Sequence, residues 1–428
     1  EFKRIFPHST VWNVRNLVYK MPKNEGKFHS KYDLCIKKIM NDINTHILSE
    51  RLFRRGNRGS HFNSLINVEL ITWNSLFILS NCKINKVIFC AKPHNIVQWI
   101  LAKVSEILNI PVLFPQISLL RNRFKLFQHT LKHKNIRLLT NTNFNEKRMI
   151  FEIDSFIEET RGSFVKIKNA PRIKNLNQKY NGEFFKLSEE IKFFFKNFSL
   201  KNPLKFIFDR PNKLTDALKK KRLLNLHRKI EIKKNKIVEN KKILTLFLHS
   251  QPERSTMPDG DIYSQQWLII RSLSRIAKKY NFVIYIKENP ATFRDRFESR
   301  YRSEFFYSSI NKIDDVYLAD LDFNSFELID LSFATASITG SCIIESIIRG
   351  KPTLTFSLEN FGNCKGIYQI LNFDDLRKIV PLLLKKDYKI NQVNVRNYLL
   401  NLYKNTISRT PGTVINKETL EALVKARI

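Results

Sequence analysis

The sequence predicts an α/β protein of two lobes, and three observations support this. Its 428 residues exceed one ordinary core and fit two domains of roughly 150–200 residues each. Hydrophobic residues make up 43% of the chain, which supplies enough apolar surface for two cores. Short apolar runs typical of buried strands alternate with helix-period segments. We therefore expect two Rossmann-like lobes with a cleft between them.

The first lobe is predicted to contain a β-loop-α-β unit. Residues 86–90 have the pattern of a buried strand, 95–108 that of a helix, and 110–114 that of a second strand. His94 lies in the loop that leaves the first of these strands. Ligands of parallel sheets bind at the carboxyl ends of the strands, so His94 is placed where chemistry can occur.

The second lobe shows a more regular alternation, which is typical of a parallel, doubly wound sheet. Its predicted strands are 243–249, 282–287, 315–318, 333–337 and 352–356. The whole chain is then expected to divide into an N-terminal lobe, a basic linker or helix, a C-terminal lobe and a C-terminal helix, over 1–200, 201–242, 243–395 and 396–428.

The chain is strongly basic, with a formal net charge of +35. Such a charge favours an anionic partner. Nucleic acid is disfavoured as the main ligand, because Lys, Asn, Ile and Phe are abundant along the whole chain, as AT-rich coding produces. The most polarised stretch is 201–242, with fifteen Lys or Arg against four Asp or Glu. We interpret it as a solvated helix and linker, with an anionic membrane surface as the alternative partner.

The expected location is the cytoplasm, with a peripheral position at the inner face of the plasma membrane as an extension of the membrane alternative. The five cysteines are scattered and form no C-x-x-C pair, so a disulfide framework or a zinc site is not expected. No signal peptide is visible, and no apolar run reaches the roughly 18–20 residues that cross a bilayer.

Three loops that follow predicted strands of the second lobe carry polar residues. The first, 249–260, is dense in polar groups and includes Gln251 and Glu253. The second places Lys287 and Asn289 before a proline that ends the strand. The right-handed crossover rule brings the carboxyl-terminal loops of such strands to one edge of the sheet.

The third loop contains Thr339, Gly340 and Ser341. Gly340 lets the backbone approach a ligand closely, and Ser341 stands at a helix N-terminus, where it serves equally as an N-cap or as a phosphate ligand. Glu345, one turn further along, is expected to face the same cleft. The shared edge of the three loops predicts a phosphate-binding site.

Residues 248–370 resemble a family of bacterial capsule and surface-polysaccharide biosynthesis proteins that is related in organisation to the GT-B glycosyltransferases and is similar to capsular Kdo- and sialyl-type transferases. The matching segments are 248–256 (LHSQPERST), 285–290 (YIKENP), 325–330 (SFELID), 339–341 (TGS), Glu345 and 350–352 (GKP). The resemblance implies a GT-B fold whose second lobe holds a nucleotide sugar and whose first lobe presents the acceptor.

One residue departs from the family pattern. Relatives that use CMP-activated sugars usually carry histidine before the proline of the second loop, where this chain has Asn289. Asparagine can donate a hydrogen bond to a phosphate oxygen, but it cannot carry the positive charge of an imidazolium.

The expected function is a glycosyltransferase of capsule biosynthesis, which moves a sugar from a nucleotide-activated donor, CMP- or UDP-linked, to a growing polysaccharide or a lipid-linked acceptor. We expect Glu253 or His94 to take the proton of the acceptor hydroxyl and Glu345 to contact the ribose or the base. The phosphate-binding and donor-binding residues are expected to be Gln251, Lys287, Asn289, Thr339, Gly340 and Ser341.

No metal and no cofactor besides the donor is expected, because the loops contain no Asp-x-Asp motif and GT-B enzymes are usually metal-independent. Two other functions remain open. A sugar-nucleotide epimerase shares the two-lobed architecture and needs no acceptor. A non-catalytic nucleotide-binding or glycan-binding subunit of a capsule assembly complex is the alternative that Asn289 favours.

Overall fold

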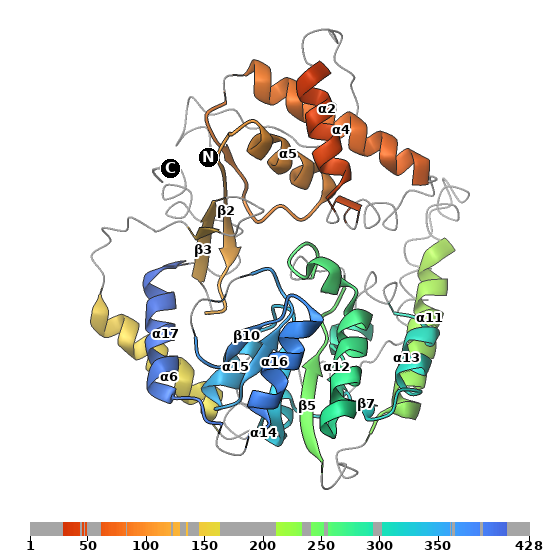
Figure 1. The fold of residues 1–428 in the computed structure, drawn as a ribbon, viewed down its shortest axis with the longest axis vertical. Helices are drawn as coiled ribbons and strands as arrows, with labels where there is room; N and C mark the ends of the chain where they lie inside the picture. Colours follow the sequence, from red (N-terminus) through yellow and green to blue (C-terminus); the bar gives the residue numbers. More distant parts are fainter. Residues whose placement is uncertain are drawn as a thin grey trace, which may run out of the picture. The chain divides into compact units, whose positions relative to one another are not determined.

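The computed structural model describes residues 29–42, 45–46, 48, 61–82, 84–120, 123–128, 134–135, 145–162, 211–232, 241–251, 256–293, 302–359, 361, 364–385 and 388–408. The chain forms two compact units. The first comprises Glu1–Asn143 together with Leu402–Ile428, and the second comprises Phe144–Asn401. Each unit is an α/β structure, as the sequence predicts (Figure 1).

The first unit combines helices with a small mixed sheet. Its helices are α2 (His29–Met40), α4 (His61–Asn81) and α5 (Ile96–Ile107). Its strands are β1 (Val87–Ile88), β2 (Val112–Ile117), β3 (Arg123–Gln128), β4 (Lys134–Asn135) and β11 (Ile407–Ser408). Strands β1 and β2 pair in parallel, whereas β3 pairs antiparallel with β2, β4 and β11.

The β-loop-α-β unit of the first lobe is confirmed. Helix α5 begins after Asn95, whose side chain accepts a hydrogen bond from the backbone N–H of Gln98 as an N-cap. Its inner side is apolar and contains Trp99, which is 2% exposed. The antiparallel strands β3 and β11 were not predicted, because neither has a period-2 pattern long enough to stand out.

The second unit contains the parallel sheet that the sequence predicts. Its strands are β5 (Lys242–Phe247), β6 (Phe282–Lys287), β7 (Val316–Leu318), β8 (Ser332–Ser337), β9 (Thr353–Thr355) and β10 (Ile367–Gln369). All neighbouring pairs are parallel. The order across the sheet is β7-β6-β5-β8-β9-β10, which is the 3-2-1-4-5-6 order of the Rossmann fold when strands are numbered as they occur in the chain.

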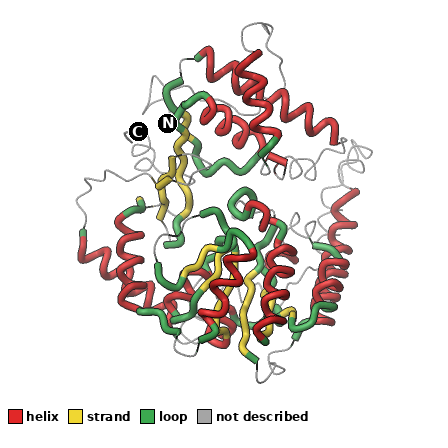
Figure 2. Tube along the Cα trace, in the orientation of Figure 1, coloured by secondary structure: helices red, strands yellow, loops and turns green. Residues whose placement is uncertain are grey.

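Helices cover both faces of this sheet, which explains why its strands are apolar runs and do not alternate (Figure 2). Every residue of β6 is buried. The helices are α12 (Gln266–Tyr280), α13 (Glu304–Ile310), α14 (Ser325–Leu331), α15 (Cys342–Ile348), α16 (Phe373–Leu383) and α17 (Gln392–Lys404), with 3₁₀ turns η3 (Asp261–Ser264) and η4 (Pro290–Phe293). Helix α12 packs on β6 and beside α16, whereas α15 packs on β8 and β9.

Helix α6 (Glu146–Arg161) lies in the range 1–200, which the sequence assigned to the first lobe, but it belongs to the second unit. The reason is a set of hydrogen bonds to the end of α15. Arg349 Nη1 donates to the carbonyl of Thr160 at 2.6 Å, and Arg161 Nε donates to the carbonyl of Ile348 at 3.1 Å.

The basic stretch 201–242 contains helix α11 (Pro211–Ile230), which packs against α13 and η4 of the second unit. Its inner side buries Leu223 and His227, both 0% exposed. The chain then pairs with the sheet edge, where the N–H of Ile232 donates to the carbonyl of Leu318 at 2.8 Å. The described part of this stretch is therefore attached to the second unit along its length. The predicted boundaries at 200 and 242 stay predictions.

No helix in the described ranges is both long enough and apolar enough to cross a bilayer.

Candidate functional site

The candidate site lies where the strand order of the second unit reverses. The chain goes from β5 outward to β6 and β7, and then returns to β8 and goes outward in the other direction to β9 and β10. The loops after β5 and β8 therefore leave the sheet side by side and diverge. In open parallel sheets this switch point is where ligands bind. The first and third predicted loops are the two loops that follow these strands.

His249 bridges the two loops across the switch point. Its Nε2 atom accepts a hydrogen bond from the backbone N–H of Thr339 at 3.2 Å and lies 3.1 Å from Ser337 Oγ. A backbone N–H is always a donor, so Nε2 is the acceptor in its contact with Thr339. The side chain is 8% exposed. The contact thus fixes the ring and the third loop together.

Gly340 is required by the close packing around this histidine. A Cβ atom at Gly340 would lie 3.0 Å from Ser337 Oγ, 3.2 Å from Cys342 Sγ and 3.5 Å from His249 Nε2. The next residue, Ser341, is exposed, and its side chain makes no capping hydrogen bond to α15. The sequence offered capping and ligand binding as alternative roles for Ser341, and in the structure its side chain does not cap α15.

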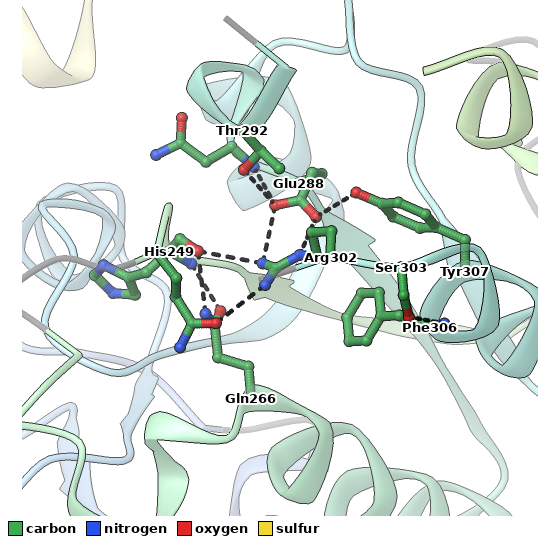
Figure 3. Close-up of polar contacts among 10 residues, drawn as sticks. His249, Gln266, Glu288, Thr292, Arg302, Ser303, Phe306 and Tyr307 are labelled. Atoms are coloured by element: carbon green, nitrogen blue, oxygen red, sulfur yellow. Dashed lines mark hydrogen bonds and ion pairs between the residues drawn. The ribbon is translucent and has the colours of Figure 1, made fainter. Parts of the chain in front are cut away.

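A buried ion pair stands beside the switch point, at the end of β6 (Figure 3). Arg302 donates from Nε to Glu288 Oε2 at 2.7 Å and from Nη2 to Oε1 at 3.1 Å. Tyr307 Oη donates to Glu288 Oε2 at 3.0 Å, and Thr292 Oγ1 donates to Oε1 at 3.3 Å. The backbone N–H of Asn289 adds a further bond at 3.0 Å. The carboxylate is 0% exposed and saturated with donors.

These contacts determine the ionisation of the pair. Burial by itself raises the pKa of Glu288, but the charge and hydrogen bonds of Arg302, the nearby His227 and the Tyr307 hydroxyl outweigh it, so the pKa lies below the usual value. Burial and the Glu288 charge raise the pKa of Tyr307 well above its ordinary value. Glu288 is therefore a charged structural anchor in the fold.

Arg302 also holds the first loop in place. Its Nη1 atom donates to Gln251 Oε1 at 3.2 Å, and its Nη2 atom donates to the carbonyl of His249 at 3.2 Å. The Gln266 side chain makes two hydrogen bonds to the backbone of His249. Its Oε1 atom accepts from the N–H at 2.8 Å, and its Nε2 atom donates to the carbonyl at 3.0 Å. Gln251 Nε2 donates to the carbonyl of Ser264 at 2.5 Å. Gln251, which we expected to contact the donor, thus shapes the loop from beneath.

Two hydroxyl groups under the first loop have no hydrogen-bond partner among the described residues. They belong to Ser250 and Ser264, both of which are 0% exposed.

Lys287 occupies a different position from the one we expected. Its Nζ atom donates to the carbonyls of Asp320 at 2.9 Å and Leu321 at 2.6 Å, and the side chain is 6% exposed. The ammonium therefore ties the end of β6 to the loop after β7. Burial lowers the pKa of Lys287 to about 8, against the opposing effect of nearby carboxylates, chiefly Asp320.

The lowered pKa of Lys287 predicts a pH-dependent stability. Between about pH 8 and the ordinary lysine value the unfolded chain binds more protons than the folded one, so the contribution of this group to stability rises with pH. From pH 8 to pH 9.5 the gain is expected to be about 1–2 kcal/mol. Urea unfolding of the wild type and of Lys287→Met at both pH values tests this. Equal pH slopes in the two proteins would refute the assignment.

The remaining predicted site residues are spread more widely. Glu345 is half-buried on α15. Burial is the main cause that raises the pKa of the Cys342 thiol, and the charge of Glu345 is the second cause, so Glu345 lies near Cys342 at the end of the third loop. His94 lies in the first unit, where its Nδ1 atom is 2.9 Å from the carbonyl of Lys92. Glu253 lies outside the described residues. Within those residues, no three His, Cys, Asp or Glu side chains gather to hold a metal ion.

Sequence reasoning missed Arg302 and did not assign a role to His249. Arg302 is separated from Gln251 by 51 positions, and no motif precedes it. His249 was visible as the first residue after a buried strand, which is a signal that places a side chain at the ligand edge of a parallel sheet.

Comparison with family models finds no match, and comparison with curated proteins finds none. Among solved structures, the chain is similar to UDP-GlcNAc 2-epimerase from Methanocaldococcus jannaschii, at 13% identity over 81% of this chain and 84% of that one, with a TM-score of 0.28. It is also similar to UDP-GlcNAc 2-epimerase from Neisseria meningitidis bound to UDP-GlcNAc, at 12% identity over 82% of this chain and 83% of that one, with a TM-score of 0.26. A third similar structure is the beta Kdo 2,4 transferase KpsC from Thermosulfurimonas dismutans, at 14% identity over 44% of this chain and 63% of that one, with a TM-score of 0.25. At these low TM-scores, the fold assignment rests on the strand order.

Proposed function

We propose that the second unit binds the nucleotide of an activated sugar at its switch point, and that the protein is a metal-independent glycosyltransferase that acts on a glycan or a lipid-linked acceptor of a surface polysaccharide. The observation that carries the proposal is the contact of His249 with Thr339 and Ser337 between strands β5 and β8 of a sheet with Rossmann order. The nature of the transferred group rests on the sequence resemblance of residues 248–370 to capsule-biosynthesis transferases.

The diphosphate or monophosphate of the donor is proposed to lie over Gly340 and Ser341. Gly340 presents no side chain, so backbone can approach the ligand closely. Ser341 offers an exposed hydroxyl that is not used as a helix cap. Thr339 is fixed by His249 and sets the position of both residues. Close, preorganised donors of this kind stabilise charge that develops on a leaving phosphate.

We propose that two of the expected phosphate ligands support the loops through their hydrogen bonds. Lys287 donates to backbone carbonyls, and the backbone N–H of Asn289 donates to the buried Glu288 carboxylate. Their main effect on the donor is then to hold the loops after β6 and β7. The Asn289 side chain, on a half-buried residue, remains a proposed contact of the donor. Proton abstraction from the acceptor remains assigned to Glu253 or His94, and contact with ribose or base to Glu345.

A nucleotide that binds only the folded protein raises its stability by RT ln(1 + [L]/Kd), which is about 2.7 kcal/mol at a hundredfold excess over Kd. Thermal unfolding with CMP, CDP, UDP and GDP is therefore expected to show a raised Tm for at least one of them, with a smaller rise in Ser341→Ala. Ser309→Ala, a similar change on α13, serves as the control. If none of the four nucleotides raises the Tm, the proposed function fails.

A second measurement separates transfer from its alternatives. The protein is incubated with sugars that are activated by the nucleotide found to bind. Each incubation is run with and without a polysaccharide or lipid-linked acceptor. Release of free nucleotide that depends on the acceptor supports transfer. Conversion of the sugar without acceptor identifies an epimerase, and binding without turnover identifies a non-catalytic subunit. Either of the last two results contradicts the transferase proposal while retaining the nucleotide site.

A further inference from the structure

Among the side chains that the structure describes, the exposed sides of helices α11 and α12 carry only positive charge. Among the described side chains of α11, the exposed cations are Lys219, Lys221, Arg222, Arg228 and Lys229. On α12 they are Arg271, Arg275, Lys278 and Lys279. No acidic residue occurs in α12 or in the described side chains of α11. Below we call these nine residues the cationic face.

This segregation of charge is not shared by other helices of the second unit. Helix α6 mixes five acidic residues with three basic ones, α16 pairs two of each, and α14 carries Glu327 and Asp330 without a cation. A uniform excess of lysine and arginine from coding bias would place cations on these helices in the same way. The cationic face is therefore a local feature of α11 and α12.

The two helices belong to one surface because α13 lies between them. The ring of His227 on α11 is 5.5 Å from that of Tyr307 on α13, and the ring of Trp267 on α12 is 6.0 Å from that of Phe306 on α13. Figure 1 shows α12, α13 and α11 together at one side of the second unit. The cationic face thus lies on two helices, α11 and α12, on either side of α13, which itself carries the exposed Glu304 and no cation.

Large apolar side chains project from two of these helices, α12 and α13. Phe305, near the start of α13, is 78% exposed, which is the highest exposure of any large hydrophobic residue in the described ranges. Leu268 on α12 is 42% exposed. An exposed phenylalanine gains free energy when it enters an apolar phase, and cations gain free energy when they meet an anionic surface.

We propose that the cationic face, together with Phe305, docks on an anionic phospholipid membrane. The cations contact lipid phosphates at the headgroup level, and Phe305 enters the boundary between headgroups and acyl chains. Surface-lying protein segments combine basic and apolar side chains in this way. Nucleic acid also attracts cations, but an exposed phenylalanine and leucine on outward-facing helices match a lipid surface better than a sugar-phosphate backbone. The inference is independent of the nucleotide site.

The first test removes charge at matched positions. One variant combines Arg222→Gln, Lys229→Gln and Arg275→Gln, from both helices of the cationic face. Its control combines Lys147→Gln, Lys365→Gln and Lys389→Gln, three exposed lysines elsewhere on the second unit. Binding of each full-length protein to phosphatidylglycerol–phosphatidylcholine vesicles is measured by flotation. A cation near an anionic surface contributes about fivefold in affinity, so the face variant is expected to bind on the order of a hundredfold more weakly.

The second test concerns the apolar contact. Phe305→Ser is expected to weaken vesicle binding at least about tenfold, because a buried aromatic ring contributes more than that to membrane affinity. Phe151→Ser is the matched control, since Phe151 on α6 is 71% exposed and lies on a helix of mixed charge. It is expected to bind as the wild type does. Neither phenylalanine is part of the buried core, so both variants are expected to fold. Thermal unfolding checks this, with a Tm close to that of the wild type as the expected result.

Several results would overturn the proposal. If the wild type binds pure phosphatidylcholine vesicles as strongly as the mixed vesicles, the cations do not contribute to binding. If both triple variants lose the same affinity, binding depends on the net charge of the protein and not on the cationic face. Undiminished binding by the face variant or by Phe305→Ser would contradict the assigned residues. If the wild type binds a short RNA but not the anionic vesicles, the surface is a nucleic-acid site. Supporting evidence is selective loss in the face variant and in Phe305→Ser.

Discussion

Replacing Arg302 by methionine is expected to lower the free energy of unfolding by about 3–5 kcal/mol, because it leaves the Glu288 carboxylate buried without its counter-ion. Both partners of this ion pair are almost fully inaccessible, with 2% and 0% side-chain exposure. The arginine also donates to Gln251 Oε1 and to the carbonyl of His249, and both bonds are lost, although the carbonyl keeps its bond from Gln266 Nε2. Urea unfolding of the purified variant gives the measurement.

The control is an exposed ion pair of the same unit. Arg377 contacts Asp374 at 3.4 Å, with 56% and 70% side-chain exposure, and Arg377→Met is expected to change stability by less than about 1 kcal/mol. A loss of similar size in the two variants would show that Arg302 is not the anchor of the loops. The expected order is a large loss for the buried pair and a small one for the exposed pair.

The Arg302 variant also tests whether this arginine affects nucleotide binding by holding the loop in place, without contacting the nucleotide itself. Arg302 is buried beneath the first loop, so it acts on nucleotide binding through the position of His249 and Gln251. Where the variant remains folded, nucleotide affinity is expected to fall because the loop is no longer held. The pKa of Glu288, which the arginine keeps low, is then expected to rise toward its unfolded value, so this carboxyl contributes a smaller loss of stability on acidification in the variant than in the wild type.

Gly340→Asp is expected to weaken nucleotide binding at least about a hundredfold, which is roughly 2.7 kcal/mol. Two effects combine. The new Cβ atom falls 3.0 Å from Ser337 Oγ and 3.2 Å from Cys342 Sγ, so it displaces the side chains that position His249. The added carboxylate then faces the proposed place of the phosphate and repels it. Isothermal titration with the nucleotide that stabilises the protein provides the measurement.

Gly162→Asp is the matched control for this substitution. Gly162 follows helix α6, and among the described residues a Cβ atom there meets the carbonyls of Glu158 and Glu159, at 3.2 and 3.4 Å. It adds the same charge to the same unit at a distance in sequence from the three loops. Nucleotide affinity is expected to stay within about twofold of the wild type. Equal weakening in the two variants would assign the effect to net charge and would contradict a phosphate at Gly340.

The fold of the second unit was predictable because its strands carry their own signal. Buried parallel strands are uninterrupted apolar runs, and 282–287 is such a run with polar residues at both ends. The alternation with helices then predicted a doubly wound sheet, and the structure confirms it with the Rossmann strand order. The mixed sheet of the first unit was harder to predict, since β3 pairs with β11, which is two residues long and lies far from β3 in the sequence.

The candidate site was predictable as an edge of the sheet but not in its internal contacts. The position of Gly340 after a strand indicates a close approach, and the structure places it beside His249. The role of Lys287 could not be inferred, because the carbonyls of Asp320 and Leu321 reach its ammonium only through the fold. Arg302 was invisible for a similar reason. Its partners come from two loops that are distant in sequence, and an isolated arginine carries no pattern.

Hydrogen exchange with and without the bound nucleotide tests the central claim most directly, since it shows which backbone amides the ligand protects. The nucleotide-binding proposal predicts slower exchange in two segments of the second unit, 248–251 after β5 and 337–343 after β8, and a smaller effect at 287–289. Protection in neither of the first two segments, with protection confined to the first unit, would contradict a nucleotide site at the switch point.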